Sequence, residues 1–189
     1  MGRNQHGLPQ GSVLGPLLLL IYINDLEHGI KSSIKFFADD TSRFSIVQDP
    51  NISAENLNHD LKLIEEWGFK WKMSFNPDPS KPAEEITFPR KRDPCDHPPI
   101  YFNNVEVKKV NEHKHLGLIL DYKLTFESHV NEKLAKARKG IGVIKYLSLR
   151  TLDLIYKMCV RPHLDFCDVI YHIPKTPSVF NSSYIALWI

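Results

Sequence analysis

The stretch IKFFADDTSRFSI, residues 34–46, places two adjacent aspartates between two runs of strand-forming residues. Side chains alternate with period two before and after Asp39 and Asp40, which predicts a β-hairpin with the aspartates at its tip. One interpretation is structural, because aspartate is a common turn residue. The other is a metal site, because two neighbouring carboxylates repel each other and bind divalent cations.

The composition is that of an ordinary globular protein. The chain has 189 residues, 42% of them hydrophobic and 24% charged, which suffices for one domain or slightly more. The formal net charge is +2, but the stretch 125–150 holds six Lys or Arg against two Glu, as in a protein that contacts a polyanion or in a solvated helix face. Three cysteines and the lack of a signal-peptide pattern predict a reduced, intracellular protein.

Periodicity predicts an α+β part followed by a helical part. The expected elements are a buried helix at about Pro16–Leu26, a helix that Ser53 could cap, a strand at 85–88, a hairpin around Asn103–Asn104 and a strand at 115–121. The second of these helices has an apolar stripe at Leu57, Leu61, Ile64, Trp67 and Trp71. An apolar stripe from Phe126 to Ile144 then predicts one helix over 126–147, and a second helix at 151–160 is expected to stop before Pro162. The expected divisions are 1–122, 123–173 and an unstructured tail at 174–189.

Several segments occur together in a specific order. GLPQGSVLGPLLLLIYINDL (7–26) and FADDT (37–41) are followed by WKMSFNPDPSK (71–81), HKHLGLILD (113–121), SHVNEKLAKARKGIGVIKYL (128–147) and VRPHLDFCDVIYH (160–172). This series resembles the reverse transcriptases of non-LTR retrotransposons, Jockey-like elements in particular, over nearly all of residues 7–174. The resemblance implies a fragment of an RNA-directed DNA polymerase, with RNA template, DNA primer and deoxynucleoside triphosphates as partners and no membrane.

The resemblance also implies a fold and a catalytic site. The fold would be a partial polymerase palm, with antiparallel strands and helices on one face, followed by a helical thumb. Asp39 and Asp40 would be ligands of a two-metal magnesium site. Lys81 would lie near the triphosphate, and Phe37 near the primer end. The segment HLGLILD (115–121) would be the hairpin that grips the primer, with an ordinary apolar strand as the alternative. Ordinary strand packing of Phe37 and a solvated loop position of Lys81 are the alternatives.

Further residues would contact nucleic acid. By the same resemblance, the template and the incoming nucleotide would lie against Gly7, Pro9, Gln10 and Gly11. The thumb would contact backbone phosphates through Lys133, Lys136, Arg138 and Lys139. A separate series, Cys159, His163 and Cys167, has helical spacing that suits zinc, but Pro162 interrupts it.

The sequence also departs from the family pattern. The fingers and an earlier palm strand with another metal-binding aspartate are expected on the N-terminal side of residue 7, and no segment resembles them. The metal site in these 189 residues would then be incomplete, and the chain alone is expected to be inactive. The alternative is a non-catalytic, nucleic-acid-binding remnant of a mobile element.

Overall fold

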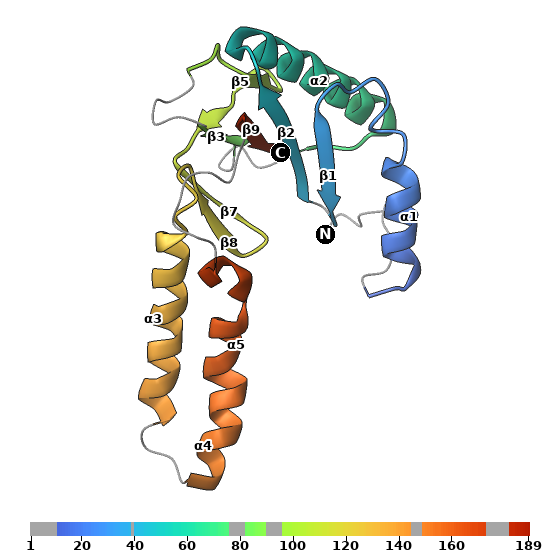
Figure 1. The fold of residues 1–189 in the computed structure, drawn as a ribbon. Coiled ribbons are helices and arrows are strands. Elements are labelled where there is room, and N and C mark those ends of the chain that lie inside the picture. Colours follow the sequence, from blue (N-terminus) through green and yellow to red (C-terminus); the bar gives the residue numbers. More distant parts are fainter. Residues whose placement is uncertain (1–10, 39, 76–81, 90–95, 145–148, 173–181) are drawn as a thin grey trace. The chain divides into compact units, whose positions relative to one another are not determined.

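The computed structural model describes residues 11–38, 40–75, 82–89, 96–144, 149–172 and 182–189, which form a mixed helix-and-sheet structure (Figure 1). The chain divides into two compact units. The first unit contains Met1–Glu85, Asp96–Lys108 and Ile185–Ile189, and the second contains Ile86–Cys95 and Lys109–Tyr184. The expected division after residue 122 therefore falls inside the second unit.

The central feature of the first unit is the expected β-hairpin. Strands β1 (Ser33–Phe37) and β2 (Asp40–Val47) are antiparallel, with a register that runs from Ser33 opposite Phe44 to Phe37 opposite Asp40. They form one edge of a five-stranded sheet with the order β1-β2-β9-β3-β6. In this sheet β3 is Glu84–Phe88, close to the strand expected at 85–88, and β6 is Lys108–Lys109.

The strand β9 (Ser183–Trp188) corrects the expectation of an unstructured tail at 174–189. It lies between β2 and β3 in the sheet, and its four residues 185–188 are all buried. A strand covered on both faces is a short apolar run without alternation, so its sequence lacks the period-two pattern of a half-exposed strand. Only its position between two strands that are distant in sequence identifies it.

Helix α2 (Pro50–Trp71) covers the sheet of this unit and contacts β2 and β4. Asp49 caps the helix, because its carboxylate accepts the N–H groups of Asn51 at 2.8 Å and Ile52 at 3.2 Å. The expected cap Ser53 instead lies buried in the first turns. Of the expected apolar stripe, Leu57, Leu61 and Ile64 are fully buried, whereas Trp71 is 40% exposed.

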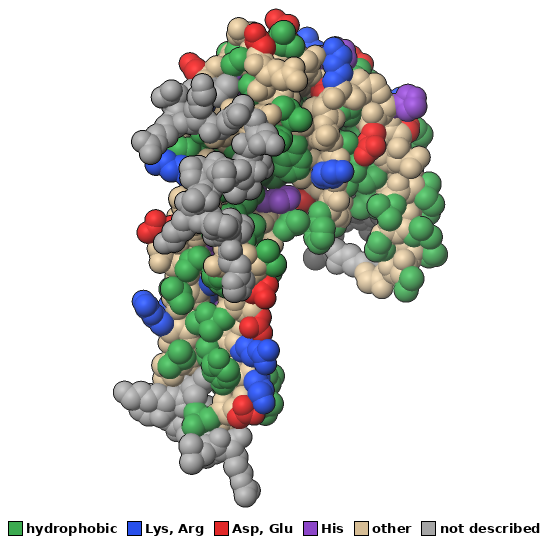
Figure 2. Space-filling model, viewed as in Figure 1, with side chains coloured by type: hydrophobic (Ala, Val, Ile, Leu, Met, Phe, Trp, Pro, Cys, Tyr) green, Lys and Arg blue, Asp and Glu red, His purple; other side chains and the backbone are tan. Residues whose placement is uncertain are grey.

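Helix α1 (Leu14–Ile23) differs from the buried helix that was expected at Pro16–Leu26. Its apolar side chains are largely exposed, among them Leu17 at 53%, Leu20 at 61% and Ile21 at 64%. Figure 2 shows these hydrophobic side chains along the helix. A helix that is apolar on every side needs neighbours all round. The described residues supply them only at its C-terminal end, where Ile23 and Leu26 are buried.

Two further hairpins have two-residue turns. Strands β4 (Tyr101–Phe102) and β5 (Val105–Glu106) pair around Asn103 and Asn104, as expected, and both asparagines have positive φ. In the second unit, β7 (Glu112–His115) pairs with β8 (Leu118–Asp121). The segment at 115–121 therefore turns at Leu116 and Gly117, so the single strand expected from its pattern is wrong and the hairpin implied by the family resemblance is present.

The second unit continues with helices. Helix α3 (Glu127–Ile144) lies beside a nearly continuous helical segment made of α4 (Leu149–Ile155), a π-helical turn η1 (Tyr156–Val160) and α5 (Arg161–Asp165), followed by a 3₁₀ turn η2 (Asp168–His172) (Figure 1). The expected stop before Pro162 is wrong, because proline fits the first turn of α5. The π turn lets the Arg161 N–H donate to the Tyr156 carbonyl just before the proline.

The buried face of α3 shares only Phe126 and Ala137 with the apolar stripe that the sequence predicted. Leu134 and Ile141 are 38% and 53% exposed. The buried side chains at this face are those of Phe126, His129, Lys133 and Ala137. Their spacing is also helical, but two of the four are polar, so a search for apolar periodicity alone misses this face.

Candidate functional site

The β1–β2 hairpin presents its tip to solvent. Phe37 and Asp40 form the last register pair, and Ala38 follows Phe37 in the connection between the strands. Ala38 has a φ of 53°, the left-handed conformation that such turns use. Asp40 is exposed, and Phe37 is 62% exposed rather than packed in the sheet. The expected accessible position is therefore confirmed for Asp40, whereas Asp39 lies outside the described residues.

A buried ion pair anchors this hairpin to helix α2. A guanidinium nitrogen of Arg43 on β2 lies 2.6 Å from a carboxylate oxygen of Asp60 on α2, and both side chains are fully buried. The same carboxylate accepts the backbone N–H groups of Lys31 at 3.0 Å and Ser32 at 2.9 Å, immediately before β1. Asp60 thus joins the entry to β1, the middle of β2 and the covering helix.

The charge state of Asp60 follows from these contacts. Burial opposes its ionisation, but the N–H groups of Lys31 and Ser32 and the guanidinium of Arg43 together hold the pKa of its carboxyl below the usual value. Burial lowers the pKa of Arg43, an effect that Asp60 partly offsets. The sequence-based expectations did not include this ion pair. The signal was present, because Asp60 is a charged residue on the buried Leu57–Ile64 stripe.

The residues expected near template and triphosphate are mostly outside the described part of the chain. This applies to Gly7, Pro9, Gln10 and Lys81. Gly11 is described and lies exposed, just before α1. The structure therefore gives a position for Gly11 alone among this group.

The four basic residues of α3 differ in their surroundings. Lys136, Arg138 and Lys139 are exposed, as expected. Lys133 is only 8% exposed, and its ammonium lies 4.0 Å from the centroid of the Phe166 ring. The expectation of an exposed Lys133 is wrong, because the helix face that packs on α5 includes it and the ring stabilises the cation.

Glu132 holds two lysines at the seam between β7 and α3. Its carboxylate forms ion pairs with Lys136 one turn further along the helix and, at 3.3 Å, with Lys114 on β7. Hydrogen bonds from these two ammonium groups lower the pKa of Glu132 to about 2. Glu112, also on β7, accepts a hydrogen bond from Ser128 at 2.5 Å. Polar contacts therefore attach the β7–β8 hairpin to one side of α3.

His129 and Phe166 provide a second attachment for the β7–β8 hairpin. The Nδ1 atom of His129 accepts the N–H of Ile119 at 3.2 Å, so the imidazole is neutral. Its burial and the nearby Lys133 lower its pKa. At the turn, a Cβ built on Gly117 would lie 3.2 Å from the Phe166 ring, and its φ is +85°. Glycine is therefore needed there both for the backbone conformation and for the close approach of the ring.

The zinc interpretation gains no support from the structure. Cys159 is exposed, and Cys167 is half-buried with a φ of 58° after the end of α5. Among the residues that the structure describes, no three His, Cys, Asp or Glu side chains lie where they could share a metal ion.

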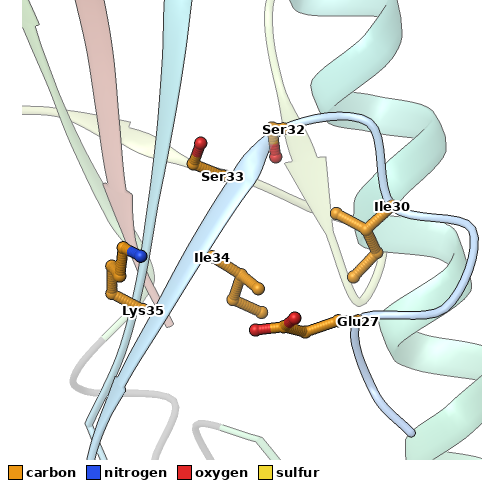
Figure 3. Close-up of a pocket in the computed structure, with 6 residues that line it drawn as sticks. All are labelled: Glu27, Ile30, Ser32, Ser33, Ile34 and Lys35. Carbon is orange, nitrogen blue, oxygen red and sulfur yellow. The ribbon is translucent and has the colours of Figure 1, made fainter.

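A small polar hollow lies beside the start of β1. It has a volume of about 240 Å³ and is lined by Glu27, Ile30, Ser32, Ser33, Ile34 and Lys35. Figure 3 shows Glu27 and Ile34 on one side of the strand, with Ser33 and Lys35 on the other. None of the residues expected at the catalytic site lines it.

None of the described helices is both long and apolar enough to cross a membrane.

Comparison with known proteins identifies the class. The family described as "Reverse transcriptase (RNA-dependent DNA polymerase)" matches residues 3–120, which include the hairpin, its anchoring helix, β7 and most of β8. The chain belongs to this family. Residues 3–120, with the exposed hairpin tip, are thus a segment of a reverse transcriptase domain.

Individual relatives are polymerases of mobile elements. The chain is 32% identical over 196 residues to a probable RNA-directed DNA polymerase from transposon X-element of Drosophila melanogaster, across 93% of this chain and 21% of the relative. It is 30% identical over 186 residues to the RNA-directed DNA polymerase from mobile element jockey of Drosophila funebris, across 88% of this chain and 19% of the relative. The chain thus spans about a fifth of the length of these relatives. No solved structure matches it.

Proposed function

We propose that residues 1–189 carry the catalytic hairpin of an RNA-directed DNA polymerase that extends a DNA primer on an RNA template. The observation that supports this most is the exposed tip of the β1–β2 hairpin, with Asp40 and Phe37 accessible, in a chain of the reverse transcriptase family. In this proposal the first unit is part of the palm. Helices α3 to α5 are the thumb, which would contact backbone phosphates through Lys136, Arg138 and Lys139.

Magnesium fits the residues at the tip. It is a hard cation that prefers carboxylate oxygens, and Asp40 offers them to solvent, with Asp39 next in the chain. Bound metal ions would hold the primer hydroxyl and the triphosphate oxygens and offset their charge. Two adjacent carboxylates on one hairpin would supply only part of the ligand set of two metal ions. Ligands from other segments of a complete polymerase would supply the rest.

The ion pair between Arg43 and Asp60 would hold the hairpin tip in position. A two-metal site depends on carboxylates that stay in place. Arg43 lies three residues from Asp40 on the same strand and is fixed by Asp60 on α2. We therefore assign Arg43 and Asp60 as positioning residues, which hold the tip without contacting substrate.

A chimaeric polymerase tests the proposal. Residues 1–189 replace the matching segment of the X-element polymerase, and magnesium-dependent primer extension is measured on an RNA template. The chimaera is expected to extend the primer, and Asp39→Asn and Asp40→Asn are each expected to abolish extension. Asp153→Asn is the matched control, because Asp153 is a well-exposed carboxylate on α4 that pairs only with Lys157 among the described contacts.

Two outcomes would contradict the proposal. One is a folded chimaera that binds primer and template but does not extend. The other is extension that persists in both hairpin variants at the level of the Asp153→Asn control. The second outcome would favour a nucleic-acid-binding role without catalysis for this segment.

A further inference from the structure

The C-terminal end of α2 carries exposed aromatic rings interleaved with lysines. In the segment WGFKWKMSF (67–75), Phe69 is 81% exposed and Trp71 is 40% exposed. Lys70 and Lys72 are exposed beside them, and the segment contains no acidic residue. We call Phe69, Lys70, Trp71 and Lys72 the Phe69 platform. None of the roles proposed above uses these four residues.

The platform rests on a rigid aromatic cluster. The Tyr22 ring meets the rings of Trp67 and Trp71 edge-on, with centroids 5.6 and 5.7 Å away. The indole N–H of Trp67 donates to Asp25 at 2.9 Å, and the Tyr22 hydroxyl donates to the Trp71 carbonyl. These contacts fix the backbone and the indole of Trp71, so that an exposed ring is held in place before any partner arrives.

The chain turns sharply after the platform. Lys72 adopts the left-handed conformation that ends α2, and the Met73 N–H donates to the Gly68 carbonyl at 2.9 Å. A Cβ on Gly68 would lie 2.8 Å from the Met73 carbonyl oxygen, so only glycine permits this close turn. The turn brings Phe75 back against Trp67, at 6.3 Å between centroids. Phe69 is left outside this cluster and projects into solvent.

Each exposed ring has a lysine ammonium over it. The Nζ of Lys72 lies 4.9 Å from the Phe69 centroid, and the Nζ of Lys70 lies 5.5 Å from the Trp71 centroid. A purely apolar partner would gain nothing from these cations and would have to desolvate them. An anionic partner with flat, aromatic groups would use the rings and the charges together.

We propose that the Phe69 platform binds single-stranded nucleic acid by stacking unpaired bases on Phe69 and Trp71. Lys70 and Lys72 contact the adjacent phosphates. Aromatic rings beside basic side chains are the usual means of binding single strands without reading sequence. The neighbouring apolar surface of α1 is not part of this site, because Leu14–Ile23 contains no charged residue.

This inference does not depend on catalysis. The platform lies on α2 rather than at the tip of the β1–β2 hairpin, and binding requires neither metal nor nucleoside triphosphate. A failure of the chimaera to extend primers would leave it intact. Conversely, loss of binding at the platform would leave the assignment of Asp39 and Asp40 intact.

Fluorescence anisotropy with the full 189-residue chain tests the proposal. The probes are a labelled oligouridylate and an abasic oligonucleotide of the same length and charge. Phe69→Ala is expected to weaken binding of the oligouridylate about five-fold or more, because one stacked base is lost. Phe69→Tyr keeps the ring and is expected to keep the affinity. Ile52→Ala is the matched control, because Ile52 is 58% exposed on the same helix.

The lysines give a second readout. The combined change Lys70→Gln with Lys72→Gln is expected to lower the slope of log affinity against log salt concentration by about 0.7 for each lysine. Lys62→Gln is the control, since Lys62 is exposed on α2 away from the aromatic segment. Circular dichroism of each variant checks that α2 is still folded.

Three outcomes would overturn the proposal. The first is wild-type protein that does not bind the oligouridylate. The second is an abasic oligonucleotide that binds as tightly as the oligouridylate, which would show phosphate contact alone. The third is Phe69→Ala that matches Ile52→Ala in affinity, which would leave Phe69 as a contact for a protein partner.

Discussion

The substitution Asp60→Ala removes the acceptor that holds the β1–β2 hairpin on α2. Arg43 would remain fully buried without its counter-ion, and the N–H groups of Lys31 and Ser32 would lose their acceptor. Breaking a buried ion pair by removing one partner costs about 3–5 kcal/mol of the free energy of unfolding. We expect a loss of this size, because both side chains have 0% exposure and solvent cannot replace the lost partner.

Urea unfolding followed by tryptophan fluorescence measures this loss. The three tryptophans of the chain, Trp67, Trp71 and Trp188, all lie in the first unit, so their emission reports on the part of the chain that contains the ion pair. The control is Lys108→Gln, which breaks a surface ion pair with Glu84 in the same unit. That change is expected to cost less than about 0.5 kcal/mol.

A double substitution distinguishes the loss of the ion pair from the cost of leaving one buried charge unpaired. Replacing Arg43 by Met and Asp60 by Leu together removes both charges, and buried pairs replaced in this way leave stability unchanged or raise it by about 1–4 kcal/mol. The double variant is therefore expected to be more stable than Asp60→Ala. If Asp60→Ala costs less than about 1 kcal/mol, or if the double variant is no more stable than it, the anchoring role of the pair is refuted.

The remaining predictions concern pH, a turn and a helix surface. The pKa of Asp60 is lowered in the folded chain. The ionised carboxylate therefore contributes fully to the free energy of unfolding above the unfolded pKa, and this contribution is lost as the pH falls through the folded pKa. Below about pH 5, the free energy of unfolding should decline less steeply in Asp60→Asn than in the wild type. Gly117→Ala should destabilise the second unit by about 1–2 kcal/mol in thermal unfolding, because it places a Cβ against Phe166 at positive φ. An unchanged unfolding midpoint would contradict the packing of Phe166 on this turn. Leu20→Lys on α1 should raise solubility in a precipitation assay. It should change the free energy of unfolding by less than about 0.5 kcal/mol, because Leu20 is 61% exposed. A large loss of unfolding free energy would show that this side of α1 is packed.

The sequence determined the elements that depend on local pattern. Alternation around Asp39–Asp40 predicted the β1–β2 hairpin, and Asn103–Asn104 predicted the β4–β5 turn, because strand period and turn chemistry act over a few neighbouring residues. The Leu57, Leu61 and Ile64 stripe predicted α2 for the same reason. The ordered motifs from residue 7 to residue 172 also predicted the family, which the comparisons confirmed.

Only the tertiary structure decided which side chains are buried and what they contact. The run at 185–188 becomes a central strand because β2 and β3, far away in sequence, lie on either side of it. Lys133 is buried because α5 brings Phe166 over it, and Asp60 is buried because Arg43 on β2 neutralises it. In each case the energy comes from a partner distant along the chain, and a polar residue on a buried face has no local pattern that reveals that partner.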